Sequence, residues 1–191
     1  MQPNVLAARF LPRIGSETLR AALLVALGVA AITLAAKIRV PMWPVPVTMQ
    51  TFAVLTVGAV CGFRLGGLTL LAYLALGALG LSVFTGEGTG LAYLAGPTGG
   101  YLLGFLVAAA LVGWLAERGW SRSVSGMVGA LALGNAVIYA FGLPWMAYLF
   151  AAERGWDFVL QWGMANFLLG DLLKLALAAV LLPALWRFTG R

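Results

Sequence analysis

Residues 21–36 read Ala-Ala-Leu-Leu-Val-Ala-Leu-Gly-Val-Ala-Ala-Ile-Thr-Leu-Ala-Ala and carry no charge. Charge-free stretches of this kind decide the fold class. Further charge-free stretches follow at 40–63, 65–86, 88–116 and 123–152, and a last apolar stretch, 158–186, is interrupted by Asp171 and Lys174. A helix needs about 20 apolar residues to cross a bilayer. The pattern therefore predicts an all-α integral membrane protein.

The composition excludes a water-soluble domain. The 191 residues are 62% hydrophobic and 9% charged, whereas soluble domains carry about 25% charged residues. The net charge of +6 comes from basic residues that lie between apolar runs, which indicates membrane topology and not nucleic-acid binding. Cys61 is the only cysteine and there is no histidine. We therefore expect no metal site, no catalytic residues and no cofactor.

Glycine and proline divide the longer stretches, and the sequence predicts a bundle of six transmembrane helices in one domain, residues 1–191. The expected helices cover 19–38, 48–63, 65–82, 98–117, 124–142 and 158–186. The first is not read as a signal peptide, because Lys37 and Arg39 follow it directly and no polar domain comes after it.

The basic residues predict the orientation. Six spans place both termini and two loops on one side, which holds Arg9, Arg13, Arg20, Arg64, Arg118, Arg122, Arg187 and Arg191. The other side holds Lys37, Arg39 and Arg154. Because basic residues concentrate on the cytoplasmic side, both termini are expected in the cytoplasm and the protein in the cytoplasmic membrane.

Two unusual linkers then face outward. Residues 40–48 contain three prolines, which favour extended backbone. Residues 83–100 are glycine-rich and apolar, which favours a packed re-entrant or capping loop over a solvated linker.

Asp171 and Lys174 are the candidate site within the last span. Three positions apart, they share one helical face. A charge inside a span costs about 2.5–3.5 kcal/mol and usually faces a cavity or the bundle interior. The pair either binds a solute or locks the helix to its neighbours, and we favour binding.

Three motifs resemble the BioY family, the substrate-binding components of energy-coupling-factor (ECF) biotin transporters. They are Pro-Val-Pro-Val-Thr-Met-Gln-Thr-Phe (44–52), Leu-Ala-Gly-Pro-Thr-Gly-Gly-Tyr-Leu-Leu-Gly-Phe (94–105) and Gly-Asp-Leu-Leu-Lys (170–174). The resemblance covers nearly the whole chain. It implies high-affinity capture of biotin from outside and release inward, driven in most systems by a transmembrane coupling subunit with two ATPase subunits. It also implies that some members transport alone, which leaves a homo-oligomer open.

The chemistry of biotin fits this pair. The ureido ring has two N–H donors and one carbonyl acceptor, which match a carboxylate and an ammonium group, and ionised partners strengthen hydrogen bonds. We expect Asp171 and Lys174 to hold the ureido head with the tail toward the outer mouth. In the rival arrangement, Lys174 pairs with the valerate carboxylate.

Further candidates each have an alternative role. Gln50 contacts the ligand or caps a helix, and Thr48 contacts it or serves as an N-cap. Trp43 and Tyr93 stack on the apolar rings or anchor the interface. Thr98, Gly99 and Gly100 offer a hydroxyl and N–H groups at a helix start. Asn166 binds solute or makes an interhelical hydrogen bond.

Ala22, Ala26 and Ala30 form a small-residue ridge on the first helix, which lets another helix approach closely. The same spacing at Gly58–Gly62 and Gly100–Gly104 is assigned to internal packing. The resemblance implies that the alanine ridge docks the coupling subunit.

The alternative functions are a proton-coupled secondary carrier for a small vitamin-like solute and an intramembrane enzyme. A proton-coupled secondary carrier would titrate Asp171, but such carriers usually have more spans and internal repeats. An intramembrane enzyme has no suitable nucleophile or base here. The chain contains no phosphate-binding Gly-x-x-x-x-Gly-Lys-Ser/Thr loop, so an ATPase must be a separate chain. Biotin, the coupling subunit with its ATPases and membrane lipid are the expected partners.

Overall fold

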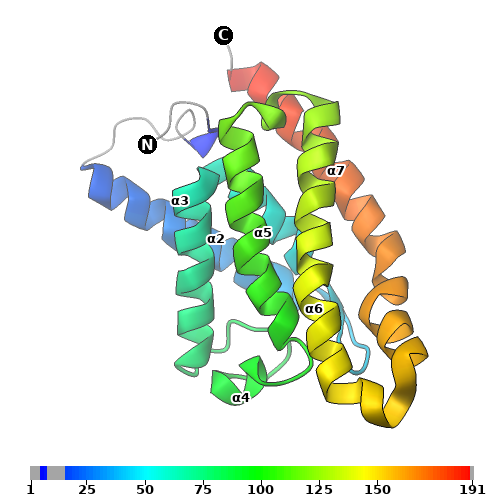
Figure 1. The fold of residues 1–191 in the computed structure, drawn as a ribbon. Coiled ribbons are helices and arrows are strands. Elements are labelled where there is room, and N and C mark those ends of the chain that lie inside the picture. The colour runs from blue at the N-terminus through cyan, green and yellow to red at the C-terminus, as the bar shows by residue number, and fades with distance from the viewer. Residues whose placement is uncertain (1–4, 8–15, 190–191) are drawn as a thin grey trace.

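The computed structural model describes residues 5–7 and 16–189, and helices dominate it (Figure 1). Arg9, Arg13 and Arg191, three of the basic residues on the expected cytoplasmic side, lie outside the described residues. The helices are α2 Glu17–Lys37, α3 Gln50–Ala78, α4 Gly90–Leu94, α5 Gly99–Glu117, η1 Trp120–Arg122, α6 Val124–Leu160, the π-helix η2 Gln161–Ala165 and α7 Asn166–Thr189. Two short strands, β1 Arg39–Val40 and β2 Val47–Thr48, complete the fold.

Helix α3 folds back on itself at Gly62. That residue has φ 82° and ψ −179°, which is not helical, and glycine adopts a positive φ without steric cost. The Cβ that Gly66 lacks would lie 3.1 Å from the Cα of Gly58, although eight residues of continuous helix span about 12 Å. The limbs 50–61 and 63–78 are therefore antiparallel. Glu117 caps the second limb, because its Oε1 accepts the N–H of Phe63 at 2.9 Å.

Helix α6 continues past residue 142, where the sequence predicts its end. Pro144 lies inside the helix, and its side chain is exposed. A proline removes one backbone hydrogen bond, yet transmembrane helices often accommodate it. The chain instead turns at Gly155, which has φ 80°. Most of the 143–157 segment, expected as an outer connection, is therefore helical.

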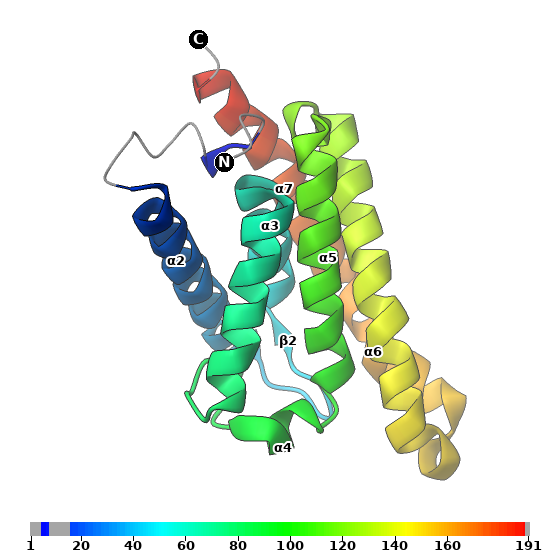
Figure 2. The same cartoon turned by 60° about the vertical axis from the view of Figure 1, so that its left-hand side comes forward.

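Small residues let the central helices approach closely. A Cβ on Gly58 would collide with the backbone carbonyl of Ala109 on α5, and one on Gly104 would lie 3.0 Å from the Cα of Ile138 on α6. The glycine spacings thus serve internal packing, as expected. Helix α2 packs on α3 at the edge of the bundle (Figure 2).

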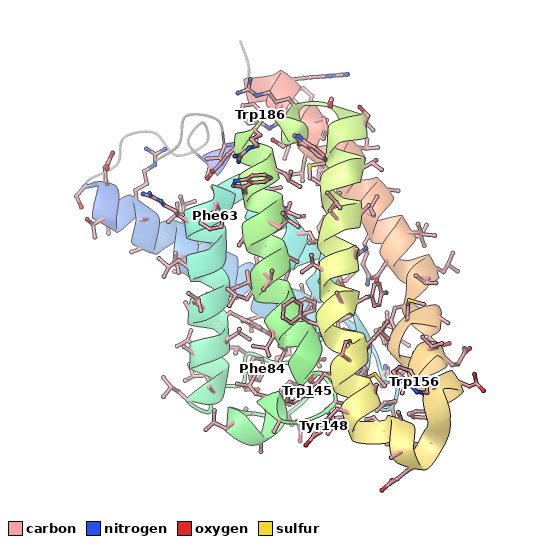
Figure 3. All side chains as sticks on the ribbon, viewed as in Figure 1. Phe63, Phe84, Trp145, Tyr148, Trp156 and Trp186 are labelled. Carbon is pink, nitrogen blue, oxygen red and sulfur yellow. The ribbon has the colours of Figure 1, made fainter. Side chains whose placement is uncertain are left out.

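The outside of the bundle is apolar. Four helical segments of the described chain are long and apolar enough to cross a membrane: Glu17–Lys37, Gln50–Ala78, Gly99–Glu117 and Val124–Phe188. Aromatic residues gather at the two ends (Figure 3), with Phe63 and Trp186 toward one end and Trp145, Tyr148 and Trp156 toward the other. Aromatic belts of this kind mark the two membrane–water interfaces.

The two linkers meet at the end that carries α4. The proline linker is extended, as predicted, and forms a hairpin in which Arg39 pairs with Thr48 and Val40 with Val47. The glycine-rich loop is packed, with Phe84 fully buried. Lys37, the last residue of α2, holds this loop by donating to the carbonyl oxygens of Phe84 at 2.8 Å and Gly86 at 3.1 Å and to Ser82 Oγ at 3.2 Å.

Candidate functional site

A cavity opens between the proline hairpin, the first limb of α3 and helices α5, α6 and α7. Its side chains surround about 540 Å³ of space, a volume that includes the open mouth. The lining residues are Val45, Pro46, Thr48, Gln50, Thr51, Thr85, Tyr93, Thr98, Tyr101, Leu102, Phe105, Ile138, Tyr139, Phe167, Asp171 and Lys174. Apolar atoms form the larger part of the wall, although ten of the sixteen lining residues also carry a polar group.

Asp171 and Lys174 form an ion pair in the cavity wall. The Nζ of Lys174 donates to Oδ1 of Asp171 at 3.0 Å, and the two side chains are only 11% and 9% exposed. Tyr139, on α6, donates its hydroxyl to Oδ2 of the same carboxylate at 2.5 Å. The carboxylate therefore has a donor on each oxygen, and the buried charges are neutralised within the site.

Gln50 lies at the start of α3 and is 4% exposed. Its Nε2 donates to the hydroxyl of Tyr73 at 2.8 Å, and that hydroxyl donates to the carbonyl of Val83 at 3.0 Å. Thr48 Oγ1 lies 3.2 Å from both the backbone N–H and Oε1 of Gln50, accepting from the first and donating to the second. These bonds fix the amide against the cavity and join the proline hairpin to the glycine-rich loop.

Tyr101 contributes a ring to the apolar wall while its hydroxyl is bonded elsewhere. The hydroxyl donates to the carbonyl of Gly163 at 2.7 Å, within the π-helix. A π-helical turn shifts the register of the backbone bonds and leaves carbonyls available to side chains. The ring can therefore face a solute without leaving a buried polar group unpaired.

Thr85, Tyr93 and Thr98, all from the glycine-rich loop, line the cavity. The ring of Tyr93 stacks on Phe84, with centroids 4.8 Å apart. Burial raises the pKa of the Tyr93 hydroxyl, so this side chain keeps its proton and remains a donor at neutral pH.

The structure brings together six of the ten residues predicted for solute binding: Asp171, Lys174, Gln50, Thr48, Tyr93 and Thr98 line the cavity. Thr48 also accepts a bond from the first helical N–H, although Met49 holds the N-cap position of α3.

The other four predicted residues do not line it. Trp43 is 55% exposed and contacts Phe150 and Phe158. Asn166 Oδ1 accepts from Gln161 Nε2 at 2.7 Å. Gly99 and Gly100 pack against neighbouring chain, because a Cβ on Gly99 would meet the carbonyl of Leu94 and one on Gly100 would meet Trp145.

Sequence reasoning missed Tyr139, Thr51 and Thr85. Tyr139 carries a detectable signal, since it is a hydroxyl-bearing residue in an apolar stretch, but its partner is 32 residues away. Thr51 and Thr85 sit beside the recognised Gln50 and within the glycine-rich loop. Threonine is common in transmembrane helices, so neither position stands out.

The site offers recognition chemistry. It combines an acceptor carboxylate, a donor ammonium, an amide and an apolar wall, which suit a solute with a small polar head and an apolar body. Among residues 5–7 and 16–189, no group of three or more His, Cys, Asp or Glu side chains lies close enough to hold a metal ion.

Known proteins match the chain along most of its length. Residues 7–191 match the model of the BioY family. The probable biotin transporter BioY of Pyrococcus horikoshii is 39% identical over 158 residues, covering 83% of this chain and 91% of that protein. The biotin transporter BioY of Rhizobium etli is 38% identical over 168 residues, covering 84% and 86%.

A solved structure shares the fold. The S-component for biotin from an ECF-type ABC transporter superposes with a TM-score of 0.78 over 92% of this chain and 95% of that one, at 24% identity. Together with the apolar helices, these relatives make the chain a multi-pass membrane protein. Its family is one of transporter components and not of enzymes. The chain belongs to the BioY family.

Proposed function

We propose that this protein captures biotin from outside the cell and takes part in its uptake as the substrate-specific component of an ECF-type transporter. The observation that carries the proposal is the largely buried Asp171–Lys174 pair, which opens onto an apolar cavity. Relatives named as biotin transporters, which match most of the chain, support biotin as the solute.

In the proposed pose, the ureido head meets the pair. Each oxygen of Asp171 already accepts one bond, yet a carboxylate has about four lone-pair sites, so it can also accept a ureido N–H. The ammonium of Lys174 donates one of its three N–H groups to Asp171, and the others can donate to the ureido carbonyl. The amide of Gln50 supplements these groups, and the rings of Tyr101 and Phe105 cover the thiophane.

A binding titration tests the proposal. The detergent-solubilised protein should bind biotin at nanomolar concentration, desthiobiotin more weakly, and thiamine and riboflavin not detectably. Tight binding of a different vitamin, or no binding of biotin, would refute the assignment.

We further propose six spans with both termini in the cytoplasm. The antiparallel limbs of α3 and the turn at Gly155 support this number, because each reverses the chain within one continuous helical segment. The start of α2 and the end of α7 lie opposite α4 (Figures 1 and 2), which supports placing both termini on one side.

Thiol labelling tests the orientation. The only native cysteine, Cys61, is buried, so background labelling is low. A membrane-impermeant thiol reagent applied to intact cells should label Glu87→Cys, in the glycine-rich loop, and spare Arg64→Cys, at the opposite end. The reverse pattern would refute the orientation.

The proposed partners are a transmembrane coupling subunit and its two ATPases. Support comes from α2, which lies at the edge of the bundle (Figure 2) and on which Ala22, Ala26 and Ala30 are all exposed. Small residues on an exposed face allow close helix–helix approach. Should the protein transport alone, a second copy is the alternative occupant of this face.

A further inference from the structure

A second, outer chamber adjoins the mouth of the cavity. It lies between the proline hairpin and the glycine-rich loop and encloses about 850 Å³, including open solvent. Pro46, Thr85, Tyr93 and Thr98 line both spaces. A solute whose head lies at Asp171 therefore has its tail directed at this shared wall.

The shared wall offers hydrogen-bond donors. Thr85 is 5% exposed, and its Oγ1 is buried without a hydrogen-bond partner among the described residues. A buried hydroxyl without a partner costs free energy unless a ligand or water satisfies it. Tyr93 adds a second hydroxyl to this wall, and Thr98 adds a third, which hydrogen-bonds that of Tyr93.

Arg39 brings a positive charge to this wall. Its Nη1 lies 2.9 Å from the position that a Cβ on Gly86 would take, which places the guanidinium against the loop residue next to Thr85. Its charge also acts on the hydroxyl of Tyr93, where it partly offsets the burial that raises the pKa. Arg39 thus lines the outer chamber beside the shared wall.

The other charges at this end do not take its place. Lys37 is occupied by its three bonds to the glycine-rich loop. Arg154 stacks on Trp43, with 4.7 Å between guanidinium and ring centroid, and lines neither chamber. Glu87 also lines the outer chamber, where its carboxylate repels an anion. A ligand carboxylate is therefore attracted only where it lies closer to Arg39 than to Glu87.

We propose that Arg39, together with the hydroxyl of Thr85, receives the carboxylate at the tail of the solute and so sets the direction in which it binds. This inference rests on the proposed binding of biotin. It follows from the contrast between the two ends. The inner end holds an ion pair whose two charges neutralise each other, whereas the outer wall combines hydroxyl donors with a guanidinium. Arg39 is then a specificity-determining residue that selects an ionised tail.

Comparison of biotin with its uncharged amide, biotinamide, tests the inference. The wild-type protein should bind biotin about tenfold more tightly than biotinamide, the usual size of a charge-assisted hydrogen bond near solvent. Arg39→Gln should weaken biotin binding by about tenfold and biotinamide binding by less than about twofold. Arg39→Lys should recover part of the preference because it keeps the charge. Glu87→Gln should strengthen biotin binding without changing that of biotinamide.

Arg154→Gln is the matched control, since it removes the same charge from the same end. Equal losses of biotin binding in Arg154→Gln and Arg39→Gln would reduce the effect to long-range attraction and overturn the direct contact. The inference also fails if Arg39→Gln weakens both ligands equally, or if Lys174→Gln is the variant that abolishes the preference. A wild-type protein that binds neither ligand would refute the proposed function itself.

Discussion

Tyr139 on α6 donates its hydroxyl to Oδ2 of Asp171 on α7 at 2.5 Å, and this bond joins the two helices at the wall of the cavity. Its geometry holds the carboxylate in a fixed orientation while Lys174 bonds the other oxygen. The candidate site is therefore a triad of residues in which the tyrosine comes from a different helix.

Tyr139→Phe removes this bond and keeps the ring. We expect biotin affinity to fall by about ten- to a hundredfold, because a hydrogen bond to a charged group contributes about 1.5–3 kcal/mol. Isothermal titration of the purified variant measures the change. Tyr148→Phe is the control, because the side chain of Tyr148 is 82% exposed. This variant should bind biotin with wild-type affinity. An unchanged affinity in Tyr139→Phe would mean that the carboxylate does not need this donor.

Asp171→Asn should abolish tight binding and also destabilise the protein. The substitution leaves the ammonium of Lys174 buried without its counter-charge, and breaking a buried pair costs about 3–5 kcal/mol. The double variant Asp171→Leu/Lys174→Leu should regain thermal stability in detergent yet bind no biotin, because both charges are gone. Biotin affinity that survives in the double variant would remove the pair from the site.

Ala26→Trp should spare binding and block transport. The side chain of Ala26 is exposed on α2, so an indole there fills the space into which a partner helix would pack. The readouts are biotin binding by the purified variant and ATP-dependent uptake of labelled biotin by cells that contain the coupling module. Val180→Trp, at a 62% exposed position on α7, controls for a bulky residue at the lipid face. Normal uptake by Ala26→Trp would exclude this face as the docking surface.

Gly58→Ala and Gly67→Ala form a matched pair on α3. A Cβ on Gly58 collides with the backbone of Ala109, so this variant should lose about 1–3 kcal/mol of stability. The nearest atom to a Cβ on Gly67 is 3.9 Å away, an ordinary contact, so this variant should be neutral or gain up to about 1 kcal/mol from reduced backbone freedom. Thermal unfolding in detergent distinguishes the two, and equal midpoints would contradict the close crossing of α3 and α5.

Local sequence signals carry the fold class and the core of the site. Charge-free stretches predict the apolar helices, and the spacing of Asp171 and Lys174 predicts their ion pair, because both depend on residues close together in the chain. The position of the turn between the limbs of α3 is predicted less exactly. The sequence places it near Arg64, where charge interrupts the run, whereas the structure places it at Gly62, where the backbone needs a positive φ.

Contacts between distant segments escape sequence reasoning. Tyr139 meets Asp171 across 32 residues, and Trp43 contacts Phe150 and Phe158 rather than the cavity. The position of an aromatic residue on an outer loop does not determine which side of the loop it faces. Pro144 likewise does not determine from the sequence where α6 ends, because proline ends helices in water but is accommodated within transmembrane helices.

The three hydrogen bonds of Lys37 couple the end of α2 to the segment that covers the cavity. This residue ends the helix, grips the glycine-rich loop and lies two positions before Arg39, where the proline hairpin starts. A partner protein that tilts or shifts α2 must either move the proline hairpin and the glycine-rich loop with it or separate the ammonium of Lys37 from its three acceptors. While these bonds hold, a force applied to the exposed side of α2 that carries Ala22, Ala26 and Ala30 is transmitted to the entrance of the cavity.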